Sequence, residues 1–114
     1  EPGGRIPPAL RAQVKALDDE AKRRATRLVR DVIDRYLLDI HSVFRDVLTL
    51  QLNTGATLVN PGIERELRDR THVHSPQTTL ALLDCVGTER ERVGMNVPPQ
   101  LALEALLAAI VAAR

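Results

Sequence analysis

The stretch LVRDVIDRYLLDIHSVFRDVL, Leu28 to Leu48, decides the fold class of this 114-residue chain. Its apolar residues recur every three or four positions, which is the period of an amphipathic α-helix. No proline or glycine interrupts the chain from Ala9 to Asn53. The apolar stripe is one residue wide before Leu28 and broadens after it. We therefore expect the second half of this segment to be core and the first half to be half-solvated.

The length of this segment leaves two arrangements open. An unbroken helix of about 45 residues would measure ~68 Å. A compact chain of 114 residues should instead have a radius of gyration near ~13 Å. Either the segment bends near Arg23 to Arg27, which gives two helices, or its N-terminal half projects as an arm.

Proline, glycine and capping residues divide the rest of the chain. Gly55 is expected to end the long segment in the left-handed conformation, and Asn60 and Ser75 to cap the helices that follow. Pro98 and Pro99 suit the first turn of a last helix. No segment alternates apolar and polar residues for long enough to form a strand. The sequence predicts an all-α bundle of four to five helices, spanning 8–27, 28–53, 61–72, 76–94 and 98–112.

Composition favours one small folded domain with a typical content of charged residues. Tyr36 and Phe44 are the only aromatic residues, so the core must consist of Leu, Val, Ile and Ala. The formal net charge of +1 gives no overall attraction to nucleic acid or to acidic membranes. Cys85 is the only cysteine, which favours a reducing, cytoplasmic setting. No stretch approaches the ~20 apolar residues of a membrane span.

Few residues are candidates for chemistry. His72 and His74 form an H-x-H pair, but a zinc site needs three or four ligands and no further ligand has suitable spacing. Cys85 lies at helical spacing from leucines and has no histidine partner to activate it. We therefore predict no catalytic residue, no metal site and no cofactor, and we do not expect this chain to be an enzyme.

A basic run supports an alternative function, a helical domain that contacts DNA. Phosphate binding depends on such clusters, but acidic residues are interleaved here and no aromatic residue is present for base stacking. A solvated ion-pair face is the simpler interpretation. The run extends from Lys22 to Arg30 and contains Lys22, Arg23, Arg24, Arg27 and Arg30.

The last helix, within NVPPQLALEALLAAI (Asn96 to Ile110), is apolar around most of its circumference. Only Gln100 and Glu104 leave a narrow polar strip. Such a helix must be buried on several sides, either inside this chain or partly by a partner subunit. Farther upstream, Arg45 and Asp46 place two charges in the most apolar part of the long helix. They must be paired, either at the rim of the core or with a partner.

Two blocks of sequence carry a resemblance to a known family. RDVLTLQLNTGATLVN (Arg45 to Asn60) and RERVGMNVPPQLALEALLAAI (Arg90 to Ile110) resemble the C-terminal region of delta-prime subunits of the bacterial clamp loader, in the DNA polymerase III complex. In that family an Asn, a following Pro and Leu-Ala-Leu-Glu lead into the final helix. Asn96, Pro98 and residues 101–104 match this pattern. The gamma/tau subunits share a related ending, and the long helix is poorer in aromatic residues here than is usual in the family.

The resemblance implies that residues 8–114 form a non-catalytic collar domain that oligomerises with gamma/tau and delta in a pentameric loader during DNA replication. Residues 1–7 would then be a linker from two AAA+ modules of the complete subunit, itself part of the DNA polymerase III holoenzyme. The domain would contact DNA only indirectly, through the assembled complex, and would not bind a membrane. The uncovered surface also predicts self-association of the isolated chain. The expected interface residues are Arg45, Asp46, Asn96, Pro98, Leu101, Leu103, Glu104, Leu107 and Ile110.

Overall fold

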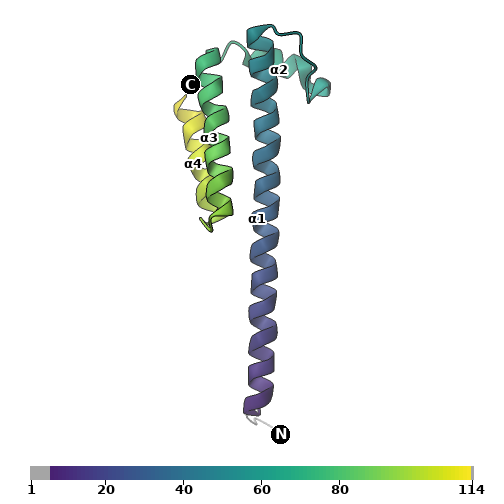
Figure 1. Ribbon diagram of the computed structural model, residues 1–114, viewed down its shortest axis with the longest axis vertical. Coiled ribbons are helices and arrows are strands. Elements are labelled where there is room, and N and C mark those ends of the chain that lie inside the picture. Colours follow the sequence, from purple (N-terminus) through teal and green to yellow (C-terminus); the bar gives the residue numbers. More distant parts are fainter. Residues whose placement is uncertain (1–5, 114) are drawn as a thin grey trace.

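The computed structural model describes residues 6–113 and confirms the all-α class. Within these residues the chain forms four α-helices and one short 3-10 helix, with no strand (Figure 1). The predicted linker lies outside the described residues except for Ile6 and Pro7. The elements are α1 (Pro8–Leu52), η1 (Pro61–Ile63), α2 (Glu64–Arg70), α3 (Pro76–Gly94) and α4 (Pro99–Ala112).

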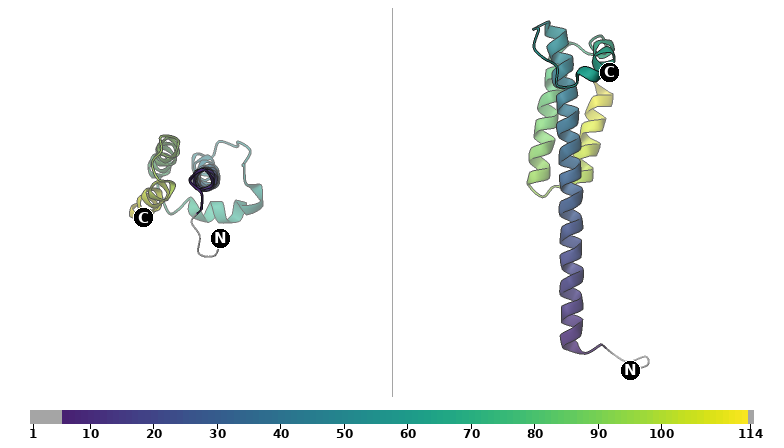
Figure 2. Two further views of the ribbon diagram at one scale, coloured as in Figure 1. Left: turned by 90° about the horizontal axis from the view of Figure 1, so that it is seen from below. Right: turned by 90° about the vertical axis from the view of Figure 1, so that its right-hand side faces the viewer.

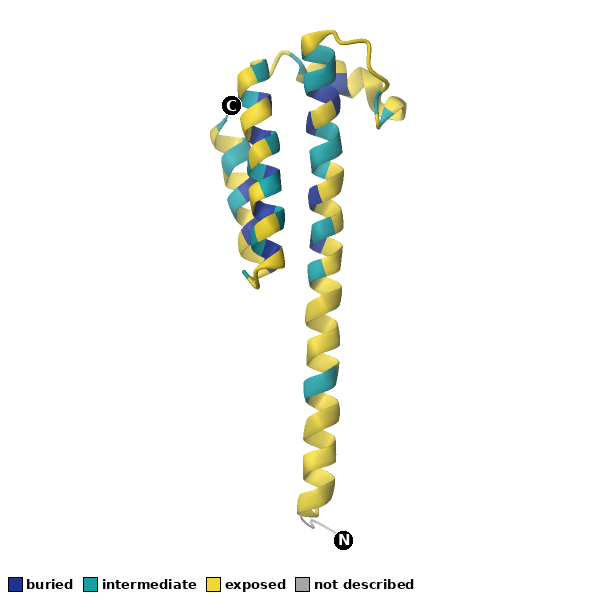
Figure 3. Cartoon of the chain, viewed as in Figure 1, coloured by how far each residue is buried: buried dark blue, intermediate teal, exposed yellow. Residues whose placement is uncertain are grey.

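Helix α1 is one continuous helix of 45 residues. The longest dimension is 73 Å and the radius of gyration is 21.4 Å, far above the ~13 Å of a compact chain of this length. The helix is not broken near Arg23 to Arg27, so the arrangement with a projecting arm is the one adopted. The first half of α1 extends beyond the bundle and is almost entirely exposed (Figure 3).

The end of α1 differs in detail from the prediction. Asn53, rather than Gly55, ends the helix, because it takes the left-handed conformation with φ 53°. Asparagine tolerates this region better than most residues. Asn60 does not cap the next helix. Its side-chain amide instead donates to Asp46 Oδ2 (3.0 Å) and Ser42 Oγ (3.1 Å) on α1.

The helices α3 and α4 begin as their capping residues predict. The Ser75 hydroxyl accepts a hydrogen bond of 3.1 Å from the Thr78 N–H, which satisfies one free donor of the first turn. After α3, Asn96 turns the chain with φ 66°. Pro98 then lies just before α4, and Pro99 is its first residue.

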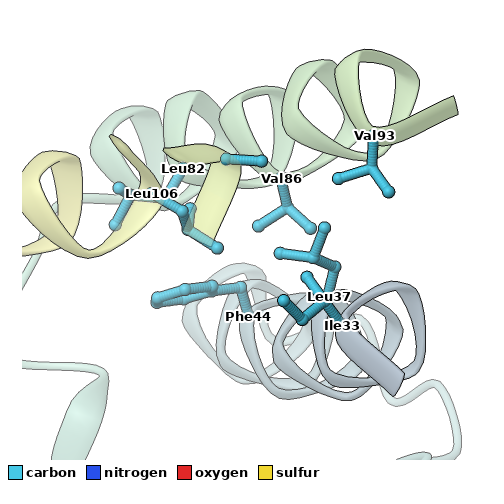
Figure 4. Close-up of a cluster of buried hydrophobic side chains, with 8 residues drawn as sticks. Ile33, Leu37, Phe44, Leu82, Val86, Val93 and Leu106 are labelled. Carbon is cyan, nitrogen blue, oxygen red and sulfur yellow. The ribbon is translucent and has the colours of Figure 1, made fainter. Parts of the chain in front are cut away.

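The core lies between the C-terminal half of α1 and the pair α3 and α4 (Figures 2 and 4). The broad apolar stripe predicted that the core would begin at Leu28, but the first buried residue of α1 is Ile33. Leu28, Val29, Val32 and Tyr36 are exposed. Helices α3 and α4 cover only one side of α1, and α2 packs only near its C-terminal end, so these four residues stay exposed. The buried cluster comprises Ile33, Leu37, Phe44, Leu82, Val86, Val93, Ala102 and Leu106.

Polar contacts fasten α3 and its following turn to α1. Arg90 Nε donates to Asp34 Oδ1 over 2.9 Å, and Arg90 Nη2 donates to Asp34 Oδ2 over 3.3 Å. Arg30 Nη2 donates to Asn96 Oδ1 over 3.3 Å. These contacts fix how far the bundle extends along α1.

Among the described helices, none has both the length and the apolarity that crossing a membrane requires.

Candidate subunit interface

Only one side of α4 is covered by its own chain. Ala102 and Leu106 are fully buried and point into the core. Ala109, Ile110 and Ala113 are partly buried around them. The covered side corresponds to one stripe of positions three and four residues apart, which is the width that a pair of neighbouring helices can hide.

The other side of α4 exposes large apolar side chains. Leu101 is 52% exposed, Leu107 is 48% exposed and Val111 is 64% exposed. Leu107 and Val111 are four residues apart and therefore lie on the same face of the helix. Glu104 is the acidic residue among them and is also exposed. This side of α4 therefore has more apolar surface than the described residues of the chain cover.

An apolar groove of about 400 Å³ runs between α4 and α1 beside this surface. Arg70 and Asp39 supply its two charges, and all other lining residues are apolar. The sequence indicated that Phe44 and Ile40 belong to the core, but it gave no signal that a groove beside them would stay open. Its apolar lining consists of Ile40, Val43, Phe44, Val47, Leu107 and Ile110.

The predicted interface residues on and before α4 differ in how accessible they are. Leu103 and Ile110 are partly buried and pack against the core, so substituting either would also disturb the fold. Asn96 and Pro98 are exposed, but their residue types have a local explanation. Asn96 takes a left-handed turn and Pro98 leads into α4.

Arg45 and Asp46 are not brought to the α4 surface. Asp46 is fully buried and accepts hydrogen bonds of 2.8 Å from the backbone N–H groups of Val59 and Asn60. Asp46 therefore holds the loop after α1 and is not exposed to a partner in this structure, and its assignment as an interface residue stays a prediction. The Arg45 guanidinium is exposed and lies 3.8 Å from the Asp46 carboxylate.

The residues considered for chemistry are not arranged as a site. His72 is exposed, whereas His74 is buried. Within residues 6–113, no group of three or more His, Cys, Asp or Glu could hold a metal ion. Burial, and then the negative charge of Glu89, raise the pKa of the Cys85 thiol. This disfavours the thiolate, which is the nucleophilic form.

The basic run is exposed on the arm except for Arg30, which is half-buried, and it is partly paired with acids of the same helix. Lys22 lies 3.0 Å from Asp18, and Arg23 lies 3.0 Å from Glu20. Arg24 also approaches Glu20, at 3.8 Å. The arm therefore presents alternating charges of both signs rather than a uniform basic face.

No protein-family model, curated protein or solved structure matches this chain.

Proposed function

We propose that this chain is the non-catalytic oligomerisation domain of a clamp-loader subunit of the delta-prime type, which helps to hold the pentameric loader together during DNA replication. The observation that carries the proposal is the uncovered apolar side of α4. Leu101, Leu107 and Val111 remain 48–64% exposed, although Ala102 and Leu106 on the opposite side of the same helix are fully buried. The family itself is proposed from the resemblance of the two sequence blocks.

The uncovered side of α4 favours binding to another polypeptide. Full burial of a Leu or Val side chain contributes roughly 1.5–3 kcal/mol, so hiding the remaining half of each would contribute about 1 kcal/mol per residue. A standard interface hides ~800 Å² per partner. The exposed side chains of α4 and the adjoining groove together offer an apolar centre for such an interface.

The groove between α4 and α1 would set the position and the orientation in which a partner helix docks. Its apolar lining can receive side chains of a partner helix, while Arg70 and Asp39 offer one charge of each sign. Charged groups around an apolar centre contribute to choice of partner more than to affinity. The partners under this proposal are the sister subunits gamma/tau and delta, which would bury the surface by docking against Leu107 and its neighbours.

Co-expression with the gamma/tau and delta subunits tests the proposal. Leu107→Asp should prevent co-purification, because a charge would then lie at the centre of the apolar contact. Leu80→Asp is a matched control, since Leu80 is 51% exposed on α3 and the exchange is the same. Circular dichroism of both variants confirms that they stay helical. Unchanged co-purification of Leu107→Asp would contradict the proposal.

A further inference from the structure

The arm of α1 carries an apolar stripe that no other part of residues 6–113 covers. We define the arm stripe as seven apolar residues of α1 that recur at the helical period and precede the start of the core. Every one of them is exposed, Leu17 at 70% and Leu28 at 64%. The arm stripe consists of Leu10, Val14, Leu17, Ala21, Ala25, Leu28 and Val32.

The spacing of the arm stripe is the same in both directions from Ala21. The steps are 4, 3 and 4 residues toward Val32 and 4, 3 and 4 residues toward Leu10. Its mean step of about 3.7 residues is close to the ~3.6 residues of a helical turn, so the stripe runs nearly straight along the helix. In a second copy of the same helix that runs in the opposite direction, an apolar residue would therefore lie opposite each residue of the arm stripe.

The charges beside the stripe reverse sign at the same residue. The sequence is DDEAKRR, with acids at 18–20 and bases at 22–24 around Ala21. Asp18 and Lys22 lie on one flank of the stripe, 3.0 Å apart, and Glu20 and Arg24 lie on the other, 3.8 Å apart. Each flank thus has one acid before the centre and one base after it.

From these two patterns we propose that the arm binds the arm of a second copy of this chain, antiparallel, with a twofold axis passing beside Ala21. A twofold interface places the same patch of both copies in contact. Leu10 then meets Val32 of the second copy, Val14 meets its Leu28, and Leu17 meets its Ala25. Ala21 meets Ala21, and these short side chains let the two helices approach closely at the centre.

The flanking charges select the antiparallel direction. In a reversed pair, Asp18 lies beside Lys22 of the second copy and Glu20 lies beside its Arg24, and symmetry repeats both contacts. In a parallel, in-register pair, the acids would lie level with acids and the bases level with bases. Like charges at this position are unfavourable, and flanking charges set orientation in paired helices. The same mixture of signs makes the stripe a poor surface for an acidic lipid or nucleic acid.

The bundle leaves this face of α1 open. Ile33, which packs toward α3 and α4, follows Ala21 by twelve residues, or ~3.3 turns of ~3.6 residues, and so points about a third of a turn away. Seen along α1, the pair α3 and α4 lies to one side of the helix (Figure 2). A second arm can therefore lie along the arm stripe without displacing either helix.

Sedimentation of the 114-residue chain over a range of concentrations tests the pairing. We expect a monomer–dimer equilibrium that weakens as salt is raised. The variant Asp18→Lys/Glu20→Lys makes all four flanking residues basic and should be monomeric at concentrations where the unaltered chain is dimeric. A chain that is monomeric at every concentration would overturn the proposal. A dimer that Asp18→Lys/Glu20→Lys leaves unchanged would also overturn it.

A charge-swapped variant tests the direction. Asp18→Lys/Glu20→Lys/Lys22→Glu/Arg24→Glu keeps the net charge and exchanges the two signs. It should form its own dimer but should not pair with the unaltered chain, because each antiparallel contact between them would join like charges. Mixed dimers are readily detected by tagging one chain. Preferential formation of mixed dimers would show parallel pairing and overturn the assignment.

This pairing is independent of the proposed subunit interface, because it uses the arm and not α4. Leu107→Asp should leave self-association through the arm unchanged. The charge-swapped variant should still co-purify with gamma/tau. An unaltered chain that co-purifies with gamma/tau but does not self-associate would overturn the arm pairing alone. An unaltered chain that self-associates but does not co-purify would overturn the subunit interface alone.

Discussion

Asp46 and Asn60 hold the loop after α1 against the helix that precedes it. The Asp46 carboxylate accepts hydrogen bonds from the Asn60 backbone N–H (2.8 Å) and from its side-chain amide (3.0 Å). Asp46 is fully buried although it carries a carboxylate. Polar groups in such a setting depend on their hydrogen bonds.

Replacing Asp46 should therefore destabilise the fold. Asp46→Ala removes an acceptor shared by Val59 and Asn60, and we expect the free energy of unfolding to fall by about 2–4 kcal/mol. Arg45→Ala is the control and should change it by under about 0.5 kcal/mol, because its contact with Asp46 is long and exposed. Urea unfolding followed by circular dichroism measures both. Equal effects of the two substitutions would be inconsistent with this role.

The raised pKa of the Cys85 thiol predicts slow reaction at neutral pH. Burial and the charge of Glu89 both oppose the thiolate, so a small aromatic disulfide should react more slowly with the folded chain than with the chain unfolded in urea. The rate should rise at a higher pH than for the unfolded thiol. Identical pH profiles in the two states would argue against this.

The same shift predicts a small loss of stability in alkali. A pKa that is higher in the folded state contributes stability that is present below the pKa of the unfolded thiol and is lost as pH rises through the folded value. Cys85→Ala should remove this part of the alkaline loss. Parallel urea titrations of the two chains at rising pH check the difference.

Removing the arm should leave the bundle folded. The core begins at Ile33, and Arg30 is the first described residue of α1 that hydrogen-bonds to the bundle, through Asn96. Deletion of residues 1–24 should therefore change the unfolding midpoint by only a few degrees at concentrations where dimers are absent. Deletion of residues 1–36 removes Ile33 and should unfold the chain more readily. A large loss of stability in the shorter deletion would indicate contacts that the structure does not show.

The alternative of a DNA-contacting domain is tested away from both proposed interfaces. Arg23 and Arg27 are exposed and, at ~3.6 residues per turn, both point away from the arm stripe. Arg23→Glu/Arg27→Glu should leave self-association and subunit assembly unchanged. We also expect the unaltered chain not to be retained on duplex DNA near ~0.15 M salt, where few phosphate contacts give weak binding. Strong retention that the double variant abolishes would favour the alternative.

Local features of the sequence predicted most of the fold. Ser75 and the prolines around α4 mark helix starts because capping depends on neighbouring residues. The apolar period of α1 predicted a helix, but it could not show which side α3 and α4 would cover. For that reason Leu28 and Val32 were expected in the core and are exposed.

The candidate interface was predicted less completely. The excess apolar surface of α4 followed from its sequence, and Leu107 is indeed about half exposed. The sequence required Asp46 to be paired, but its partners could not be foreseen, because they are backbone N–H groups 13 and 14 positions later. The groove beside Leu107 likewise depends on the distance between α1 and α4, which no local pattern records.

Hydroxyl-radical labelling of side chains, with and without gamma/tau and delta subunits, tests the central claim most directly. The free chain is measured at a concentration where it is monomeric. If α4 docks against a sister subunit, labelling of Leu107 and Val111 should fall on assembly, while labelling of Leu80 on α3 stays unchanged. Equal labelling of Leu107 and Val111 in the free and assembled states would contradict the account.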